Sequence, residues 1–409
     1  SRKWFLNNHK SLENFKGFLL ELNRLCLCIN KKKLLDLALI RQLEDKAVVW
    51  FKNSNQYIVV EKLTASIIEQ LLYKESKQKI TKNLVDELDI PLIEALNFVT
   101  DLNKQLVIPN TIKHTEENSV VLEYEVPLSF AFENYYLINS KIIKVVFSTE
   151  FELSLIHPKF AHLETTATTD VDFLFQVFNN SKDTFLIVDG IFVGAWTHEN
   201  IHYFQGKFCM KIIESIYQKK ENEWMGVFHA SAINYKEDAL LILGDSGNGK
   251  STSLALLQAQ GFHCIADDFV PIDTNHKVVA FPAGISIKPK AVDVLISEYP
   301  SLKMAAEYYY KRLNKTVRYL PPKNINYKKK FPCKALVFIK YDTSVELKVS
   351  KISNLEAFES LVPDSWISKV SENAASFLTW FSNLPCYQLT YSNNEMMYAT
   401  IKSIFEEEL

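Results

Sequence analysis

The sequence predicts an α/β protein that contains more than one domain. Its 409 residues exceed what a single hydrophobic core usually serves, so we expect two or three domains. An apolar run, a glycine-rich loop and a helix-forming run follow one another over residues 239–260, an order typical of α/β proteins. Two other patterns precede it: closely spaced helical patterns before residue 110 and short strand-like runs after residue 119.

Composition and charge exclude several classes of partner. Apolar residues make up 47% of the chain, charged residues 23%, and the net charge is −2, so we expect no nucleic-acid partner. No apolar run approaches the ~18–20 residues of a membrane span, so we expect no membrane partner. The six cysteines contain no CxxC pair, which suits reduced thiols in a cytoplasmic protein. The sequence leaves open whether the chain forms a homo-oligomer.

The N-terminal part combines helical and hairpin patterns. Residues 1–47 predict a helical extension, because leucines recur at helical spacing between positions 11 and 45. Two β-branched or aromatic runs around a polar break over 48–60 predict a hairpin. Three helices, headed by Thr64, Thr81 and Pro91, and a short strand over 105–109 complete a winged-helix-like unit.

Residues 48–110 resemble the PqqD-type domain, which holds the leader peptides of enzymes that modify ribosomally made peptides. The likeness consists of hydrophobic spacing and a helix-entry Thr or Asn, a pattern that other winged helices share. It implies that a peptide adds as a strand to the exposed edge of the hairpin. The alternative is a winged helix used for domain packing or dimerisation.

Residues 119–225 predict an α+β segment that leads into the next domain. Runs such as "KIIKVVF" and "TFLIVDG" indicate strands, and Phe208, Ile212 and Ile216 indicate a helix from about 206 to 219. The C-terminal domain is expected over 226–409 and begins with a strand over 226–235.

The stretch "GDSGNGKS", residues 244–251, fits the pattern GxxxxGK[ST] at every fixed position. Its glycines allow backbone N–H groups to converge on phosphate oxygens at the start of a helix. We therefore expect a nucleotide bound with Mg²⁺, Lys250 reaching the phosphates and Ser251 contacting the metal. We expect ATP, although the sequence does not distinguish it from another phosphoryl donor. The residues expected to bind the nucleotide are Gly244, Asp245, Ser246, Gly247, Asn248, Gly249, Lys250, Ser251 and Thr252.

A pair of carboxylates follows a short apolar strand at residues 264–266. Asp267 and Asp268 are thereby expected at the C-terminal edge of a sheet, where α/β proteins place ligands. One can hold Mg²⁺ and the other can accept a proton from an attacking hydroxyl. The sequence does not settle which does which; we expect Asp267 to be the base, and Ser251 and Asp268 to be the metal ligands.

His229, the loop and the two aspartates together resemble the core of the HPr kinase/phosphorylase family. The likeness is close over about 226–273 and fainter to about 340. It implies a kinase fold in which His229, Lys250, Asp267 and Asp268 are catalytic. The region 279–290 departs from the family, because "VAFPAGISIKPK" stands where an ERGLG-like signature is expected, and this puts HPr itself in doubt as the substrate.

A basic stretch lies between Lys303 and Lys334, with ten Lys or Arg against one acid, Glu307. It is either a solvated face or a lid that meets anionic groups, with Arg318 as a phosphate or acceptor contact. Lys288 is a second candidate contact of this kind.

These observations predict an ATP-dependent kinase that phosphorylates a Ser or Thr hydroxyl of a ribosomally made peptide. The alternatives are a kinase for a small hydroxyl compound, and a non-catalytic, nucleotide-regulated peptide chaperone.

Overall fold

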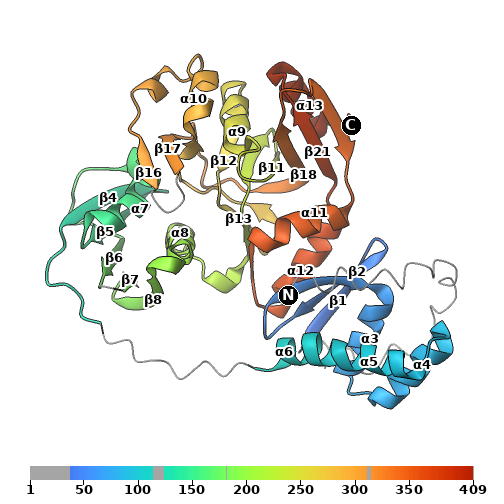
Figure 1. The fold of residues 1–409 in the computed structure, drawn as a ribbon. Coiled ribbons are helices and arrows are strands. Elements are labelled where there is room, and N and C mark those ends of the chain that lie inside the picture. The colour runs from blue at the N-terminus through green and yellow to red at the C-terminus, as the bar shows by residue number, and fades with distance from the viewer. Residues whose placement is uncertain (1–36, 114–123, 181, 311–314, 409) are drawn as a thin grey trace.

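The chain is a mixed α/β protein with several sheets (Figure 1). The computed structural model describes residues 37–113, 124–180, 182–310 and 315–408. Within these ranges, every helix is too short or too polar to cross a lipid bilayer.

The first part is a three-stranded antiparallel sheet followed by helices. The strands, in sheet order, are β1 (Ala38–Leu43), β2 (Lys46–Phe51) and β3 (Gln56–Glu61). The helices are α3 (Lys62–Leu72), α4 (Lys77–Leu88), α5 (Leu92–Leu102) and α6 (Ile108–Thr111), with a π-helical turn at Asn103–Val107 before α6. The hairpin and the three successive helices are thus where the sequence predicts them.

Two predictions for this part are wrong. Residues 38–43 form a strand, not part of a helical extension, because they pair along their whole length with β2. Residues 105–109 are helical, because Leu106 and Val107 are buried in the core formed with the three helices. The third strand of the sheet is β1, which pairs with β2. Residues 1–36 of the expected extension lie outside the described ranges.

The helix starts also differ from the prediction. Ser76 caps α4 by accepting a hydrogen bond from the Lys79 N–H (3.3 Å), whereas Thr64 and Thr81 are buried inside their helices. The predicted capping residues are therefore core residues.

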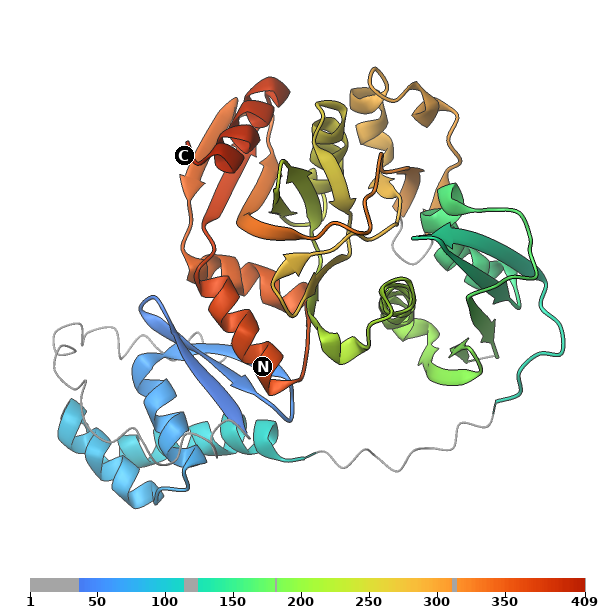
Figure 2. The ribbon, with the colours of Figure 1, turned by 180° about the vertical axis from the view of Figure 1, so that it is seen from behind.

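The middle part is a five-stranded sheet. Its strands, in sheet order, are β4 (Phe132–Ile138), β5 (Lys141–Phe147), β6 (Phe173–Asn179), β7 (Asp183–Val188) and β8 (Ile191–Thr197). Helix α7 (Glu150–Phe160) joins the parallel pair β5 and β6, and α8 (Ile201–Tyr217) is the helix predicted near 206–219. Figures 1 and 2 show α8 between this sheet and the large C-terminal sheet.

The C-terminal part contains a ten-stranded sheet. Its strands are β9 (Trp224–Phe228), β10 (Ser231–Tyr235), β11 (Asp238–Leu243), β12 (His263–Ala266), β13 (Val270–Asp273), β14 (Lys277–Val278), β18 (Phe331–Tyr341), β19 (Leu347–Lys351), β20 (Trp366–Ile367) and β21 (Cys386–Tyr391). A separate small sheet has the order β15 (Ile285–Ile287), β17 (Lys315–Leu320), β16 (Tyr308–Tyr310). The helices are α9 (Lys250–Ala259), α10 (Pro289–Leu295), α11 (Asn354–Leu361), α12 (Ser371–Ser382) and α13 (Asn394–Glu406).

Strand direction determines where the functional residues meet. The predicted strand over 226–235 is broken at His229 into β9 and β10, which belong to different stretches of the sheet. β10 lies antiparallel between β11 and β12, with Ser231 opposite Ile242 and Ala232 opposite Ala266. The C-terminal ends of β11 and β12 and the start of β10 therefore lie at one edge of the sheet.

The N-terminal sheet is covered on both faces. Val49 and Ile58 pack with the helices α3–α5, whereas Tyr57 packs against α11 and α12. The Tyr57 ring lies 5.5 Å from that of Phe377 and 6.2 Å from that of Phe358, in edge-on geometry. Burial raises the pKa of Tyr57 well above its ordinary value. The outer face of this sheet is consequently packed against helices α11 and α12 of the C-terminal part.

Two hydrogen bonds add to this docking. The Asn55 side-chain amide donates to the Ile367 carbonyl of β20 (2.8 Å), and Glu44 accepts from the Asn354 N–H at the start of α11 (2.7 Å). The turn before β3 thus lies directly beside β20.

Candidate active site

The glycine-rich loop connects β11 to α9 as the sequence predicts. The φ values of Gly244, Gly247 and Gly249 are 141°, 104° and 95°. Residues with a side chain rarely adopt such positive φ values. A Cβ on Gly244 would lie 2.6 Å from the Ile339 carbonyl oxygen of β18. Glycine at this position therefore lets the loop approach the neighbouring strand.

The end of the loop presents the start of α9. Gly249 is the N-cap, and Lys250, Ser251 and Thr252 form the first turn, so unpaired backbone N–H groups gather there. Lys250 is only 7% exposed, and its ammonium group donates a hydrogen bond to the Gly244 carbonyl across the loop. A helix start and a lysine inside one loop form an arrangement suited to an anion.

Asp267 lies at the end of β12 and is 2% exposed. Its Oδ1 accepts hydrogen bonds from the Ser231 hydroxyl (2.6 Å) and the Ser251 hydroxyl (3.2 Å). Its Oδ2 accepts one from the Ser286 N–H (3.0 Å). The carboxylate of Asp267 is therefore fixed against the first turn of α9, beside the glycine-rich loop.

Burial raises the pKa of Asp267 to about 7, and the neighbouring Asp268 carboxylate adds to the rise. The hydrogen bonds from Ser231, Ser286 and Ser251 act in the opposite direction. Near neutral pH the side chain is thus poised between its neutral and charged forms.

This raised pKa predicts a pH-dependent cost to folding. Because the folded pKa lies above the ordinary 3.8, the carboxyl favours the folded state at low pH, and that contribution is lost as the pH rises through about 7. Without divalent metal, wild type is expected to lose up to about 1.4 kcal/mol per pH unit between about pH 4 and pH 7, relative to Asp267→Asn. Urea unfolding of both proteins across this range measures the difference; parallel stability curves would contradict it.

Asp268 differs from its neighbour in exposure. Its side chain is exposed, and its φ of 61° turns the chain sharply after β12. A ring nitrogen of His229, at the bend between β9 and β10, donates to the Asp268 backbone carbonyl (3.3 Å). His229 is also exposed, so an accessible imidazole bonds to the backbone of the residue that carries the accessible carboxylate.

The two further candidates have different surroundings. The Lys288 ammonium lies against the loop and donates to the Ser246 hydroxyl (3.2 Å). The Arg318 guanidinium instead donates to the Leu302 carbonyl (2.7 Å) and to Glu307 (2.9 Å). Arg318 does not line the cavity at the aspartates, because its side chain lies on the other face of β17 from Lys315 and Tyr319.

A cavity of about 1240 Å³ opens beside Asp267, Asp268 and His229. Its other walls come from α7, α8, β17 and the segment before β20. Four residues near this site were not predicted from the sequence: Lys159 and Lys315 in the cavity walls, and the Asp267 partners Ser231 and Ser286. Lys315 belongs to the basic stretch, which could have indicated it. No motif in the neighbouring sequence indicates the other three residues.

Much of the basic stretch is paired elsewhere. Lys329 contacts Glu237 (2.8 Å), Lys330 contacts Asp273 (2.9 Å), and Lys334 contacts Glu407 (3.0 Å). These lysines are held by acids of the fold, as the solvated-face alternative implies. Lys311 and Arg312 lie outside the described ranges.

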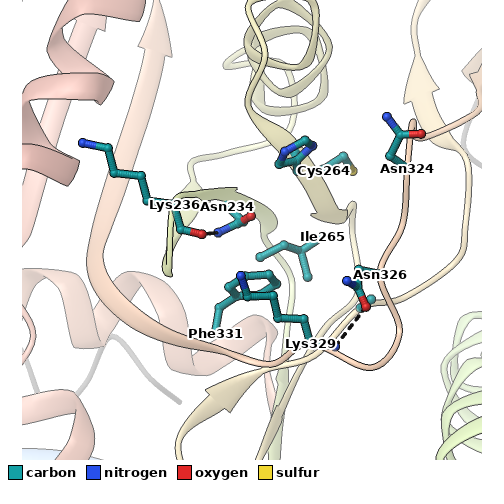
Figure 3. Close-up of a pocket in the computed structure, with 10 residues that line it drawn as sticks. Asn234, Lys236, Cys264, Ile265, Asn324, Asn326, Lys329 and Phe331 are labelled. Carbon is teal, nitrogen blue, oxygen red and sulfur yellow. Dashed lines mark hydrogen bonds between the residues drawn. The ribbon is translucent and has the colours of Figure 1, made fainter.

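A second cavity of about 340 Å³ lies at the opposite ends of β10 and β12 (Figure 3). Four of its polar lining residues, Asn234, Lys236, Asn326 and Lys329, have partners within the protein. The Asn234 amide donates to the Lys236 carbonyl (2.9 Å), and Asn326 accepts from the Lys329 N–H (3.1 Å). Lys236 also pairs with Glu406 (3.0 Å). Its lining thus serves the fold.

No group of three or more His, Cys, Asp or Glu side chains in the described ranges is arranged to hold a metal ion by itself.

No protein-family model and no curated protein matches the chain. Among solved structures, the Hpr(Ser) kinase/phosphatase from Coxiella burnetii is similar at 11% identity, with a TM-score of 0.19 over 44% of this chain and 95% of that chain. Function must therefore be argued from the geometry of the site.

Proposed function

We propose that this protein is an ATP-dependent kinase that transfers the γ-phosphate to a hydroxyl group. The observation that carries the proposal is the contact between Ser251, at the end of a GxxxxGK[ST] loop, and Asp267, beside an exposed Asp268 that faces a large cavity. A phosphate-binding loop, a buried carboxylate and an accessible carboxylate are the parts that phosphoryl transfer to an alcohol requires.

The nucleotide phosphates would bind residues 244–252. The backbone N–H groups of the loop and of the first turn of α9 would donate to phosphate oxygens, and Lys250 would exchange the Gly244 carbonyl for a phosphate. Lys288, already in contact with the loop at Ser246, would neutralise further charge.

Ser251 and Asp267 would hold Mg²⁺. A hydroxyl and a carboxylate oxygen 3.2 Å apart are hard ligands of the type this ion prefers. When bound, the ion would neutralise negative charge on the phosphates. This reverses the assignment expected from the sequence, because the buried Asp267 touches Ser251 whereas Asp268 is exposed.

Asp268 would accept the proton of the attacking hydroxyl. Its carboxylate is exposed beside the cavity, where an acceptor can reach it. His229 would position this segment through its hydrogen bond to the Asp268 carbonyl and would lie near the transferred group.

We further propose that the acceptor is a Ser or Thr of a ribosomally made peptide, held by the PqqD-like unit. β3 is an edge strand that, among the described residues, pairs with β2 alone. The Lys52 N–H bonds to Leu37 on the β1 side, so alternation along the ladder leaves the N–H groups of Tyr57 and Val59 facing the open edge. Asn55, just before β3, contacts β20, and the residues before and in β20 line the cavity.

The test is incubation with Mg-ATP and candidate precursor peptides, read by mass spectrometry. We expect a mass increase of one phosphate. We also expect Val59→Pro to raise the KM for the full-length precursor at least about tenfold, because proline removes an outward N–H. Val59→Ala is the matched control, since it keeps that N–H while shortening the same side chain.

The outcomes separate the alternatives. Phosphorylation of small hydroxyl compounds, with no effect of Val59→Pro on any peptide, would indicate a small-molecule kinase. Equal effects of Val59→Pro and Val59→Ala would show that the edge hydrogen bond is not used. Absence of phosphate transfer to every acceptor would overturn the kinase proposal.

A further inference from the structure

Two lysines, Lys159 and Lys315, lie in the walls of the large cavity. Lys159 comes from the end of α7 and Lys315 from the start of β17, and both share the cavity with Asp268 and His229. Both side chains are half-buried. Segments far apart in the chain therefore bring two cations to the acceptor side of the site.

The segment 284–286 connects the two lysines with Asp267. The Gly284 N–H donates to the Lys159 carbonyl (2.8 Å), and a Cβ on Gly284 would lie 3.1 Å from the Tyr319 Cβ. Two residues on, Ser286 pairs with Tyr319 and donates its N–H to Asp267. A single short segment thus contacts the end of α7, strand β17 and the buried carboxylate.

Neither ammonium group forms an ion pair with an acid of the described residues. Among the residues that the structure describes, no carboxylate lies within 4.0 Å of Lys159 or Lys315, unlike Lys329 and Lys330 of the same basic stretch. Burial lowers the pKa of Lys315; Asp268 opposes this effect, and Lys288 and Lys159 add to it. Partly buried cations without partners are costly to the fold, and an anionic ligand would remove that cost.

We infer that Lys159 and Lys315 form a subsite for an anionic group of the acceptor. The acceptor class is then a hydroxyl compound, or a Ser or Thr residue, that carries a carboxylate or phosphate near the reacting hydroxyl. The nucleotide phosphates have Lys250 and Lys288 at the loop, which leaves this second pair of cations for the acceptor. The inference rests on the proposed kinase function.

Calorimetric titration of inorganic phosphate tests this subsite. The protein is first saturated with Mg²⁺ and a β,γ-imido ATP analogue, so that the loop and the γ-phosphate position are filled. Wild type is expected to bind one phosphate, and Lys159→Gln and Lys315→Gln to weaken it at least about tenfold. Lys159→Arg and Lys315→Arg should retain it, and Lys323→Gln, outside the cavity, is the matched control.

Each outcome decides the matter. Affinity for the analogue should stay within about threefold in the glutamine variants; a fall in it would mean that these lysines hold the nucleotide, and would overturn the inference. So would the absence of phosphate binding to wild type, or unchanged binding in both variants. A wild-type protein that binds no analogue in the first step would instead overturn the proposed function, and the subsite with it.

Discussion

Replacing Asp268 with asparagine is expected to slow phosphoryl transfer by about 10²–10⁴-fold, while Mg-nucleotide affinity changes by no more than a few-fold. The carboxylate is exposed and accepts no hydrogen bond from the described residues, so its removal deletes a base without breaking a contact of the fold. Asparagine also tolerates the φ of 61° at this position, so the backbone is retained. Single-turnover kinetics and equilibrium nucleotide binding measure the two effects separately.

Asp267→Asn is the matched variant and should behave in the opposite way. Asp267 accepts from Ser251 and is buried, so its charge serves the metal side of the site. We expect Mg-nucleotide affinity to fall about tenfold or more. If Asp268→Asn weakened binding and Asp267→Asn did not, the roles expected from the sequence would be correct and those proposed from the geometry wrong.

The same pair tests the chaperone alternative. A nucleotide-regulated scaffold would bind nucleotide and peptide in both wild type and Asp268→Asn, with no phosphate transfer by either. Transfer by wild type that disappears in the variant supports the kinase.

Gly244→Ala is expected to lower the free energy of unfolding by about 2–4 kcal/mol and to abolish nucleotide binding. The added Cβ would lie 2.6 Å from the Ile339 carbonyl, a backbone atom that cannot move aside without shifting β18. The φ of 141° is a second source of strain. Urea unfolding and nucleotide titration are the measurements.

Gly247→Ala provides the control for the steric part of this effect. Gly247 also has a positive φ, 104°, but a Cβ there would meet nothing within 4 Å. Its cost should be limited to backbone strain, about 1–2 kcal/mol. Equal losses in the two variants would show that the approach to β18 is not the cause.

The parts of the site that lie close together in sequence could be predicted, because strand, loop and helix follow one another within residues 238–259. The carboxylate pair could be placed because β12 runs in the same direction as β11. The different environments of Asp267 and Asp268 could not be predicted, because Ser231 and Ser286 contact Asp267 from other strands. Lys159 could not be predicted for the same reason: only tertiary packing brings α7 to this edge.

The errors in the N-terminal part have a similar cause. Residues 38–43 carry leucine and isoleucine at positions that fit a helix face, but pairing with β2 satisfies their backbone and selects the strand. The bend at His229 likewise has no local marker, because its apolar neighbours suit one continuous strand.

The burial of the N-terminal sheet on both faces has a consequence for substrate choice. A recognition domain on a flexible linker presents a bound peptide over a range of distances from the active site. A domain packed between two sets of helices would hold the bound peptide at one distance from the active site. In a precursor gripped there, the number of residues between the gripped segment and the modified side chain would act as a ruler. Length along the substrate, as well as its chemistry, would then decide which hydroxyl is reached.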